Sequence, residues 1–261
     1  MLAFLRSPGA VALTAAIALT GCSRSRQQPV QKSETATPVY FKADPATAGT
    51  ITGQILFAGK KPQRKVVDMD EDPQCSKLHK TAVINDAIAV NRNGTLANVF
   101  VYVKDGLGGK QFEPPAVPVA LNQKGCWFEP RVVGMQSGQM LTVSNSDPVT
   151  HNVHPRPQAN REWNQSQAPG EPPINRRFMH PEVMIRVKCN IHSWMHAWIG
   201  VVDHPYFAVT GSDGAFELPN LPPGAYTIEA WQEKLGSQTQ QITVAQSGKA
   251  VVDFTFQGAD E

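Results

Sequence analysis

Hydrophobic and polar residues alternate with a period of two along several short stretches of this chain, which is typical of β-strands that bury one face. Turn-forming residues separate these stretches, and no window keeps a helical period for three turns. The pattern therefore predicts an all-β fold. The predicted strands cover residues 50–57, 96–103, 139–144, 182–189, 198–202, 225–231, 239–244 and 250–256.

Composition narrows the class of protein. Of the 261 residues, 41% are hydrophobic and 18% are charged, which is typical of a globular protein and not of a disordered or membrane-embedded one. The 20 glycines and 21 prolines favour short strands joined by turns. The formal net charge is only +2, which offers no surface for following a phosphate backbone, so we expect no nucleic-acid partner.

The first residues of the chain have the pattern of an export signal. An apolar run over residues 11–19 is too short to cross a bilayer, which takes about 20 residues. The run ends in Leu19-Thr20-Gly21-Cys22, which resembles the bacterial lipobox. The resemblance implies that residues 1–21 are removed and that Cys22 becomes an acylated N-terminus. The alternative is an ordinary cleaved secretory signal.

The next stretch is expected to be a tether. Residues 22–47 are polar and contain scattered prolines, a composition that cannot bury a core and behaves as a flexible chain. We therefore expect a lipoprotein of the cell envelope that faces the periplasm or lies on the surface. Its lipid anchor would attach it to a membrane.

Candidate metal ligands gather around the end of one predicted strand. Cys189 closes the alternation of 182–189 on the same face as the inward residues of that strand. His192 and Met195 follow within six residues, so a thiolate, an imidazole and a thioether share one tight loop. His151, which follows another predicted strand, is the candidate for the fourth ligand.

The softness of these ligands indicates the metal. Two imidazoles, one thiolate and a weak thioether suit copper better than zinc, calcium or magnesium. A trigonal plane of two His and one Cys with a long axial sulfur accommodates both Cu(I) and Cu(II), which serves one-electron transfer. The sequence therefore predicts one type 1 copper ion on His151, Cys189, His192 and Met195. His196, next to Met195, is the alternative axial ligand.

These motifs together resemble a cupredoxin, and the short Cys-x2-His-x2-Met loop is most similar to amicyanin. The resemblance covers about a third of the chain and implies a Greek-key β-sandwich with a blue copper site at one end. It is carried by Phe128-Glu129-Pro130, Gly138-Gln139, Val143-Ser144-Asn145-Ser146-Asp147, His151-Asn152-Val153 and Cys189-Asn190-Ile191-His192-Ser193-Trp194-Met195.

The resemblance also implies roles for residues around the metal. Asn152 is expected to hydrogen-bond across to the cysteine loop and keep the site rigid. Trp194 is expected to pack beside His192, and His196 to lie close to the site. The stretch 154–180 is longer than the family usually has, and it either caps the copper site or docks a partner.

Two cysteines remain after Cys22 and Cys189 are assigned. In an oxidising compartment a disulfide between Cys75 and Cys126 is plausible. The alternative is a pair of free buried thiols.

The last part of the chain resembles the carboxypeptidase-regulatory-like, transthyretin-like sandwich, through the stretches 209–218 and 221–228. That family usually opens with a strand like 49–55, which here lies far upstream. We therefore expect one sandwich split by an inserted copper domain, and the alternative is three sequential β units. The expected boundaries are 48–110 and 204–258 for the two parts of this sandwich and 111–203 for the copper domain.

The favoured function is electron transfer by the copper ion, with redox partner proteins. The alternative is a copper-holding or sensing module, or a structural sandwich without a redox role. No Ser/His/Asp arrangement, phosphate-binding glycine loop or pair of carboxylates argues for catalysis, so we do not expect an enzyme.

Overall fold

The structure is a computed structural model that describes residues 38–63 and 65–258. These residues belong, apart from Pro38, to one compact unit, Val39–Glu261. The predicted signal peptide, the lipidation of Cys22 and most of the tether lie outside the described residues and stay predictions. Among the described residues, no helix has the length and apolar character needed to span a bilayer.

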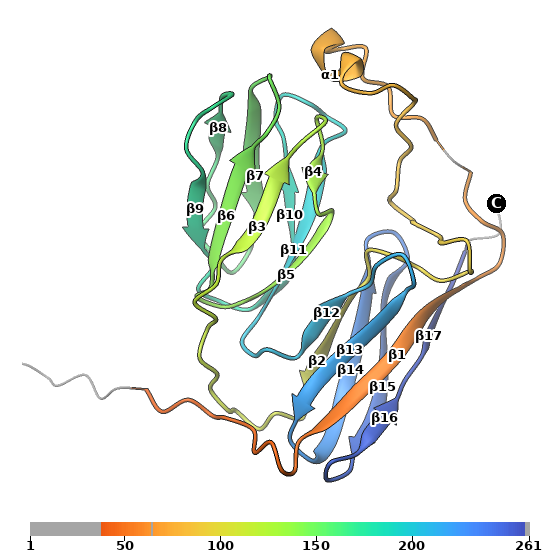
Figure 1. Cartoon of the computed structure of the whole chain (residues 1–261), viewed down its shortest axis with the longest axis vertical. Helices are drawn as coiled ribbons and strands as arrows, with labels where there is room; N and C mark the ends of the chain where they lie inside the picture. The colour runs from red at the N-terminus through yellow and green to blue at the C-terminus, as the bar shows by residue number, and fades with distance from the viewer. Residues whose placement is uncertain (1–37, 64, 259–261) are drawn as a thin grey trace, which may run out of the picture. The chain divides into compact units, whose positions relative to one another are not determined.

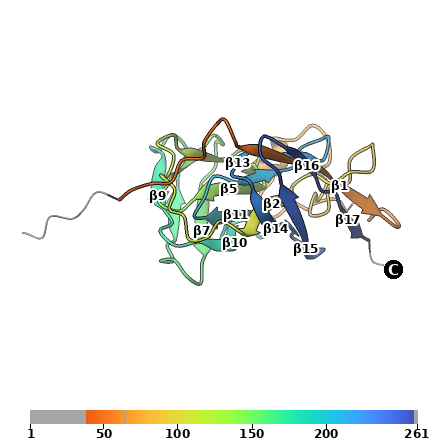
Figure 2. The same cartoon turned by 90° about the horizontal axis from the view of Figure 1, so that it is seen from below.

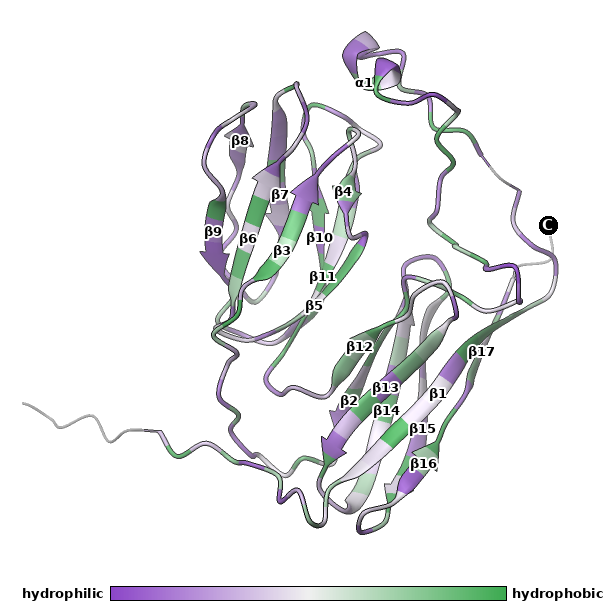
Figure 3. Cartoon of the chain, viewed as in Figure 1, coloured by the Kyte–Doolittle hydropathy of each residue, from purple (hydrophilic) through white to green (hydrophobic). Residues whose placement is uncertain are grey.

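The all-β prediction is confirmed. The single α-helix in the described part of the chain is α1 (Pro73–Lys77), and all other regular elements are strands (Figure 1). The strands form two β-sandwiches, each with its own hydrophobic core. Strand β11 (His196–Val202) is largely hydrophobic, whereas α1 is largely hydrophilic (Figure 3).

The first sandwich takes its strands from both ends of the described chain. In one sheet, β1 pairs with β13, β16 and β17, and in the other the order is β12-β2-β14-β15. Strands β16 and β17 lie beside β1 in both views (Figures 1 and 2). The bounds are β1 (Gly49–Ala58), β2 (Phe100–Asp105), β12 (Phe207–Val209), β13 (Ala215–Leu221), β14 (Gly224–Gln232), β15 (Gly236–Val244), β16 (Lys249–Val251) and β17 (Phe254–Gln257).

Strand β1 pairs with strands more than 150 residues later in the chain, Gly49 opposite Leu221 for example. The division into one split sandwich with an inserted domain stays a prediction. The expected boundaries at residues 48, 110 and 204 stay predictions.

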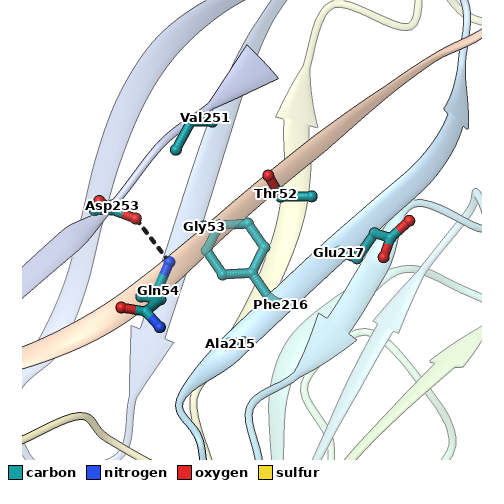
Figure 4. A pocket seen from close by; sticks show the side chains of 8 residues that line it. All are labelled: Thr52, Gly53, Gln54, Ala215, Phe216, Glu217, Val251 and Asp253. Carbon is teal, nitrogen blue, oxygen red and sulfur yellow. Dashed lines mark hydrogen bonds between the residues drawn. The ribbon is translucent and has the colours of Figure 1, made fainter. Parts of the chain in front are cut away.

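A glycine explains why the predicted strand 250–256 is in fact two strands, β16 and β17. A Cβ atom at Gly53 would lie 1.8 Å from the carbonyl oxygen of Val252. Only glycine therefore allows β1 to approach the segment around Val252 this closely. The Val252 N–H donates to the Thr52 carbonyl at 3.0 Å, and the last strand restarts after it. An open depression of about 550 Å³ lies beside Phe216 on the same sheet (Figure 4).

The second sandwich contains the predicted copper domain. Its sheets have the orders β5-β11-β10-β7-β8 and β4-β3-β6-β9. The long stretch 154–180 supplies one of the two edge strands of each sheet, β8 and β9. The bounds are β3 (Val119–Gln123), β4 (Phe128–Glu129), β5 (Val132–Gln136), β6 (Met140–Asn145), β7 (His151–Arg156), β8 (Gln165–Gln167), β9 (Ile174–Arg177) and β10 (Glu182–Lys188).

One detail of the predicted alternation in 182–189 is wrong. Ile185, Val187 and Cys189 lie in the core of the second sandwich as expected, but Val183 packs in a different cluster. The pairing of β10 with β11 is irregular between Glu182 and Ile185. A register shift of this kind turns the side chains on its far side to the other face of the sheet.

The two sandwiches are joined by a shared apolar cluster. Strand β2 is buried on both faces: Val101 and Val103 face the first core, whereas Phe100 and Tyr102 face residues of the second sandwich. The predicted strand 96–103 was expected to bury one face only. The cluster contains Phe100, Tyr102, Val132 and Val202, with Val183, Met184, Trp198, Phe207, Val209 and Trp231 packed against it.

A buried ion pair joins the same two sandwiches. Arg131, which precedes β5, donates to Glu233 after β14 through Nε at 2.9 Å and Nη2 at 3.0 Å. Trp198 Nε1 also donates to Glu233, at 2.8 Å. Burial opposes ionisation of this carboxyl, but His196 nearby and the hydrogen bonds and charge of Arg131 lower the pKa of Glu233 to about 2.

Replacing this carboxylate should cost stability at neutral pH. We expect Glu233→Gln to lower the free energy of unfolding by about 3 kcal/mol at pH 7, because the folded state holds the pKa near 2 against 4.5 in the unfolded chain. The difference from wild type should be fully present above pH 4.5 and should vanish as the pH falls towards 2. Urea unfolding at several pH values measures it.

The matched control is Glu217→Gln, which changes an exposed carboxylate on β13 and should leave stability within about 0.5 kcal/mol of wild type. Equal stability of wild type and Glu233→Gln at pH 7 would contradict the prediction.

Candidate metal centre

Neighbouring strands bring the predicted ligands to one end of the second sandwich. His151 is the first residue of β7, and Cys189 directly follows β10, which pairs with β7 (Figure 1). His192 and Met195 lie in the loop between β10 and β11. The antiparallel pairing of β7 and β10 therefore places His151 close to a loop about 40 residues later in the chain.

Three donor atoms converge at this end. The Nδ1 atoms of His151 and His192 lie 3.1 Å apart, and the Cys189 Sγ atom lies 3.8 Å from the latter. The three side chains are buried, with exposed fractions of 0%, 2% and 4% for His151, His192 and Cys189. Their ligand atoms all lie within 4.8 Å of one another, and Cys189 is the free cysteine of the described chain.

Both imidazoles are bound to carboxylates through their other nitrogen. His151 Nε2 lies 2.8 Å from Asp147 Oδ2, and His192 Nε2 lies 3.0 Å from Asp72 Oδ2. Because an ionised carboxylate only accepts hydrogen bonds, each Nε2 carries a proton and each Nδ1 of a neutral ring presents a lone pair. If both rings are neutral, their lone pairs face each other across 3.1 Å, an arrangement that a bound cation stabilises.

The electrostatics of His151 also favour positive charge at this centre. Burial lowers the pKa of His151, but hydrogen bonds to Asp147 and Cys189 outweigh burial and leave this pKa above its usual value. Burial raises the pKa of Asp147, yet its bonds to His151 and to the N–H groups of Cys126 and Gly125 bring it below the usual range. The ionised Asp147 carboxylate therefore favours a positive charge beside it at this centre.

The Cys189 sulfur is prepared to be a thiolate. Backbone N–H groups of Asn152, Ile191 and His192 donate to its Sγ atom at 3.3, 3.4 and 3.4 Å. Burial raises the pKa of this thiol, but the bond to His151 and these N–H groups bring it below the ordinary value. A thiolate is the form that binds a metal.

The two candidates for the axial position, Met195 and His196, have different surroundings. Met195 is fully buried in the same core cluster as Cys189, and its carbonyl accepts from the Cys189 N–H at 3.0 Å. His196 uses both ring nitrogens elsewhere: Nε2 accepts from Arg131 at 2.6 Å, and Nδ1 donates to the Trp194 carbonyl at 3.0 Å. Axial ligation by Met195 stays a prediction, and His196 has no free nitrogen for it.

Two further residues named from the sequence surround the ligands. Asn152 accepts from the Asn190 N–H at 3.2 Å, which is the bridge to the cysteine loop that the cupredoxin resemblance implies. The Trp194 ring lies 5.2 Å from the His192 ring, and its Nε1 donates to the Cys126 carbonyl at 3.1 Å. Both contacts hold the loop between β10 and β11 in place.

The structure also contains further neighbours of the centre. Cys75 and Cys126 form the disulfide that was one of two alternatives from the sequence, and its place beside the centre was not predicted: the Cys75 Sγ atom lies 3.5 Å from His192 Nε2. The roles of Asp147 and Asp72 were not predicted. Asp147 belongs to one of the motifs that resemble cupredoxins, so the sequence contained a signal that could have placed it near the centre. Asp72 has no local signal, because only long-range folding brings it to His192.

The donor set fits copper. Two imidazole Nδ1 atoms, a thiolate and an adjacent thioether are soft to intermediate ligands, and three of them are already assembled and buried. Carboxylates on the far nitrogens fix the tautomers that such a metal requires.

Comparison with known proteins adds one family and several weak structural similarities. A family model described as the carboxypeptidase regulatory-like domain matches residues 199–257, so this part of the chain resembles that domain. A search of curated proteins finds no match. The family match covers too little of the chain to place the whole protein in the family.

Similar solved structures include copper proteins. A purple cupredoxin from Nitrosopumilus maritimus is 16% identical over 32% of this chain and 98% of its own, with a TM-score of 0.28. A reduced mutant of amicyanin is 19% identical over 34% and 91%, also with a TM-score of 0.28. The copper-containing nitrite reductase of Thermus scotoductus is 23% identical over 38% of this chain, with a TM-score of 0.32. This chain covers only 25% of that reductase. None of these similarities identifies the present protein.

The carboxylate on His151 should matter for metal affinity. We expect Asp147→Asn to weaken copper binding by about 10–100-fold, because the ring loses the charged partner that fixes its orientation and basicity. Competition with a copper chelator measures the affinity. The control Asp203→Asn, at an exposed position outside the centre, should bind as wild type does, and equal affinities for all three proteins would contradict the expected role.

Proposed function

We propose that this protein holds one type 1 copper ion on His151, Cys189 and His192, with Met195 as the weak axial ligand. It then serves as a one-electron carrier between partner proteins and catalyses no reaction of its own. The observation that carries the proposal is the convergence of two imidazole Nδ1 atoms, 3.1 Å apart, beside the Cys189 sulfur, whose thiol has a lowered pKa.

A copper ion bound there supplies a one-electron couple between Cu(I) and Cu(II). The protein's contribution is to keep the ligands still. Asp147 and Asp72 hold the two imidazoles, and three backbone N–H groups hold the Cys189 sulfur. Ligands that do not move between two oxidation states permit fast electron transfer.

Burial favours a carrier over an enzyme. The three donor side chains have almost no exposed surface, so the side chains around them leave no room for a substrate at the metal. A catalytic metal site instead keeps an open coordination position.

The proposal extends to the cell envelope. We propose that acylated Cys22 anchors the protein to a membrane and that the tether of residues 22–47 lets the folded part meet its redox partners. Labelling with a fatty-acid analogue, lost in Cys22→Ser, checks this part of the proposal.

A copper-holding or sensing module is the second candidate. The observation that favours it is the burial of His192 beneath Asp72 and the disulfide, which separates this ligand from any partner surface. Reversible electrochemistry and rapid electron exchange with a soluble redox protein favour the carrier, whereas slow exchange favours the store.

The copper site itself is tested by adding Cu(II) to the purified folded portion. We expect an intense visible band from charge transfer between the Cys189 thiolate and copper, and we expect Cys189→Ser to abolish it. His180→Ala, which changes an exposed histidine away from the donor atoms, should keep the band. A colourless wild-type protein after loading would refute the proposal.

The axial ligand is tested by two variants at adjacent positions. Met195→Leu should keep the visible band but raise the reduction potential, because loss of the weak sulfur ligand destabilises Cu(II) more than Cu(I). His196→Gln should leave the potential of the bound copper close to wild type, since its ring nitrogens bind Arg131 and the Trp194 carbonyl. The opposite pattern would make His196 the axial ligand.

A further inference from the structure

A segment of the first sandwich reaches over the metal centre of the second. It leaves the sandwich after β1 and returns at Thr95, which bridges to Leu56. Residues 59–63 and 65–94 of this excursion are called the cap segment, and α1 lies within it. Bridging of Val66 with Ile84 gives the segment a short two-stranded stem.

The cap segment is attached to the metal centre by several kinds of contact. The disulfide joins Cys75 of α1 to Cys126, in the loop between β3 and β4. His79 Nε2 lies 2.7 Å from the Gly125 carbonyl of the same loop. A small buried cluster of Met69, Cys75, Cys126 and Val149 lies between the two, with Val67, Val83, Trp127 and Trp194 packed against it.

Asp72 joins the cap segment to a metal-binding residue. Its Oδ1 atom accepts from the Gln74 N–H at 2.9 Å, and its Oδ2 atom lies 3.0 Å from His192 Nε2. The first bond and the nearby disulfide set the orientation of the carboxylate. The second bond then sets which nitrogen of His192 faces Cys189 and His151.

We infer that Asp72 is a positioning residue for His192, supplied from outside the copper domain and held in place by the disulfide. This inference rests on the proposed function, in which His192 binds the metal through Nδ1. Asp72 keeps the proton on Nε2, so Nδ1 stays free for the metal, and its negative charge favours the more highly charged Cu(II) over Cu(I).

The same contacts enclose the imidazole. His192 is surrounded by the Asp72 carboxylate, by the Cys75 sulfur at 3.5 Å and by the Trp194 ring at 5.2 Å. Among the residues of this loop, Ile191 is the exposed apolar one, with an exposed fraction of 51%. A partner that meets this face therefore contacts the loop beside Cys189 and does not contact the His192 ring.

The first test uses the metal-free protein, so it does not depend on copper binding. We expect nitrogen-15 NMR of the wild-type imidazole to show His192 protonated on Nε2, with slow exchange of that proton with water. In Asp72→Ala the proton loses its acceptor and its cover, so its exchange should accelerate at least tenfold and the preference for one tautomer should fall. Asp70→Ala, an exposed aspartate of the same cap segment, should resemble wild type.

Unchanged tautomer and exchange in Asp72→Ala would overturn the inference. Because Asp72 also caps α1, a merely structural role would lower stability in this variant without moving the His192 signal. The double variant Cys75→Ser with Cys126→Ser tests the attachment. It should accelerate the same exchange while the two sandwiches stay folded, and wild-type exchange would show that the disulfide does not hold the cap segment.

The second test uses the copper-loaded protein. Asp72→Asn should weaken Cu(II) binding relative to Cu(I) by about tenfold, which corresponds to a rise of about 59 mV in the reduction potential. Asp70→Asn should leave the potential unchanged. A wild-type potential in Asp72→Asn would overturn the electrostatic part of the inference. A protein that binds no copper would instead refute the proposed function, and the metal-free test would still decide the role of Asp72.

Discussion

The centre of this protein is built around one electrostatic constraint. Two imidazole rings face each other through Nδ1 atoms 3.1 Å apart, and a carboxylate holds each ring from behind. The proposed metal ion would be held by these two nitrogens and the Cys189 sulfur, with Met195 as the weaker fourth ligand. The loops of the second sandwich, the disulfide and the cap segment keep the two rings buried and fixed in orientation.

The first sandwich contributes to the centre although it carries none of the proposed ligands. The second sandwich follows β2 of the first and leads into β12, and the cap segment leaves the first sandwich after β1. The apolar cluster around Phe100 and the buried pair of Arg131 with Glu233 fix one sandwich against the other. That rigidity matters because Asp72 and His192 belong to different sandwiches, and a small displacement between them would break their hydrogen bond.

Enclosure of His192 bears on what the copper ion would do. A carrier needs a short path from the metal to a partner, and here the path through the imidazole ends at Asp72 and a disulfide. The exposed route that remains runs through Ile191, whose N–H donates to the Cys189 sulfur at 3.4 Å. Electron transfer requires that a partner reach the metal, either through Ile191 or after the cap segment moves. Copper holding requires neither.

Local pattern in the sequence was enough for the all-β class and for the grouping of Cys189 with His192, because strand alternation and close spacing are local properties. His151, about 40 residues earlier, was named as a candidate because it follows another predicted strand. The disulfide followed only as one of two alternatives, since composition cannot place two sulfurs 51 residues apart in contact. Only the tertiary structure decided that Asp72 reaches His192, because that contact spans 120 residues and two sandwiches and leaves no periodicity or motif in the sequence.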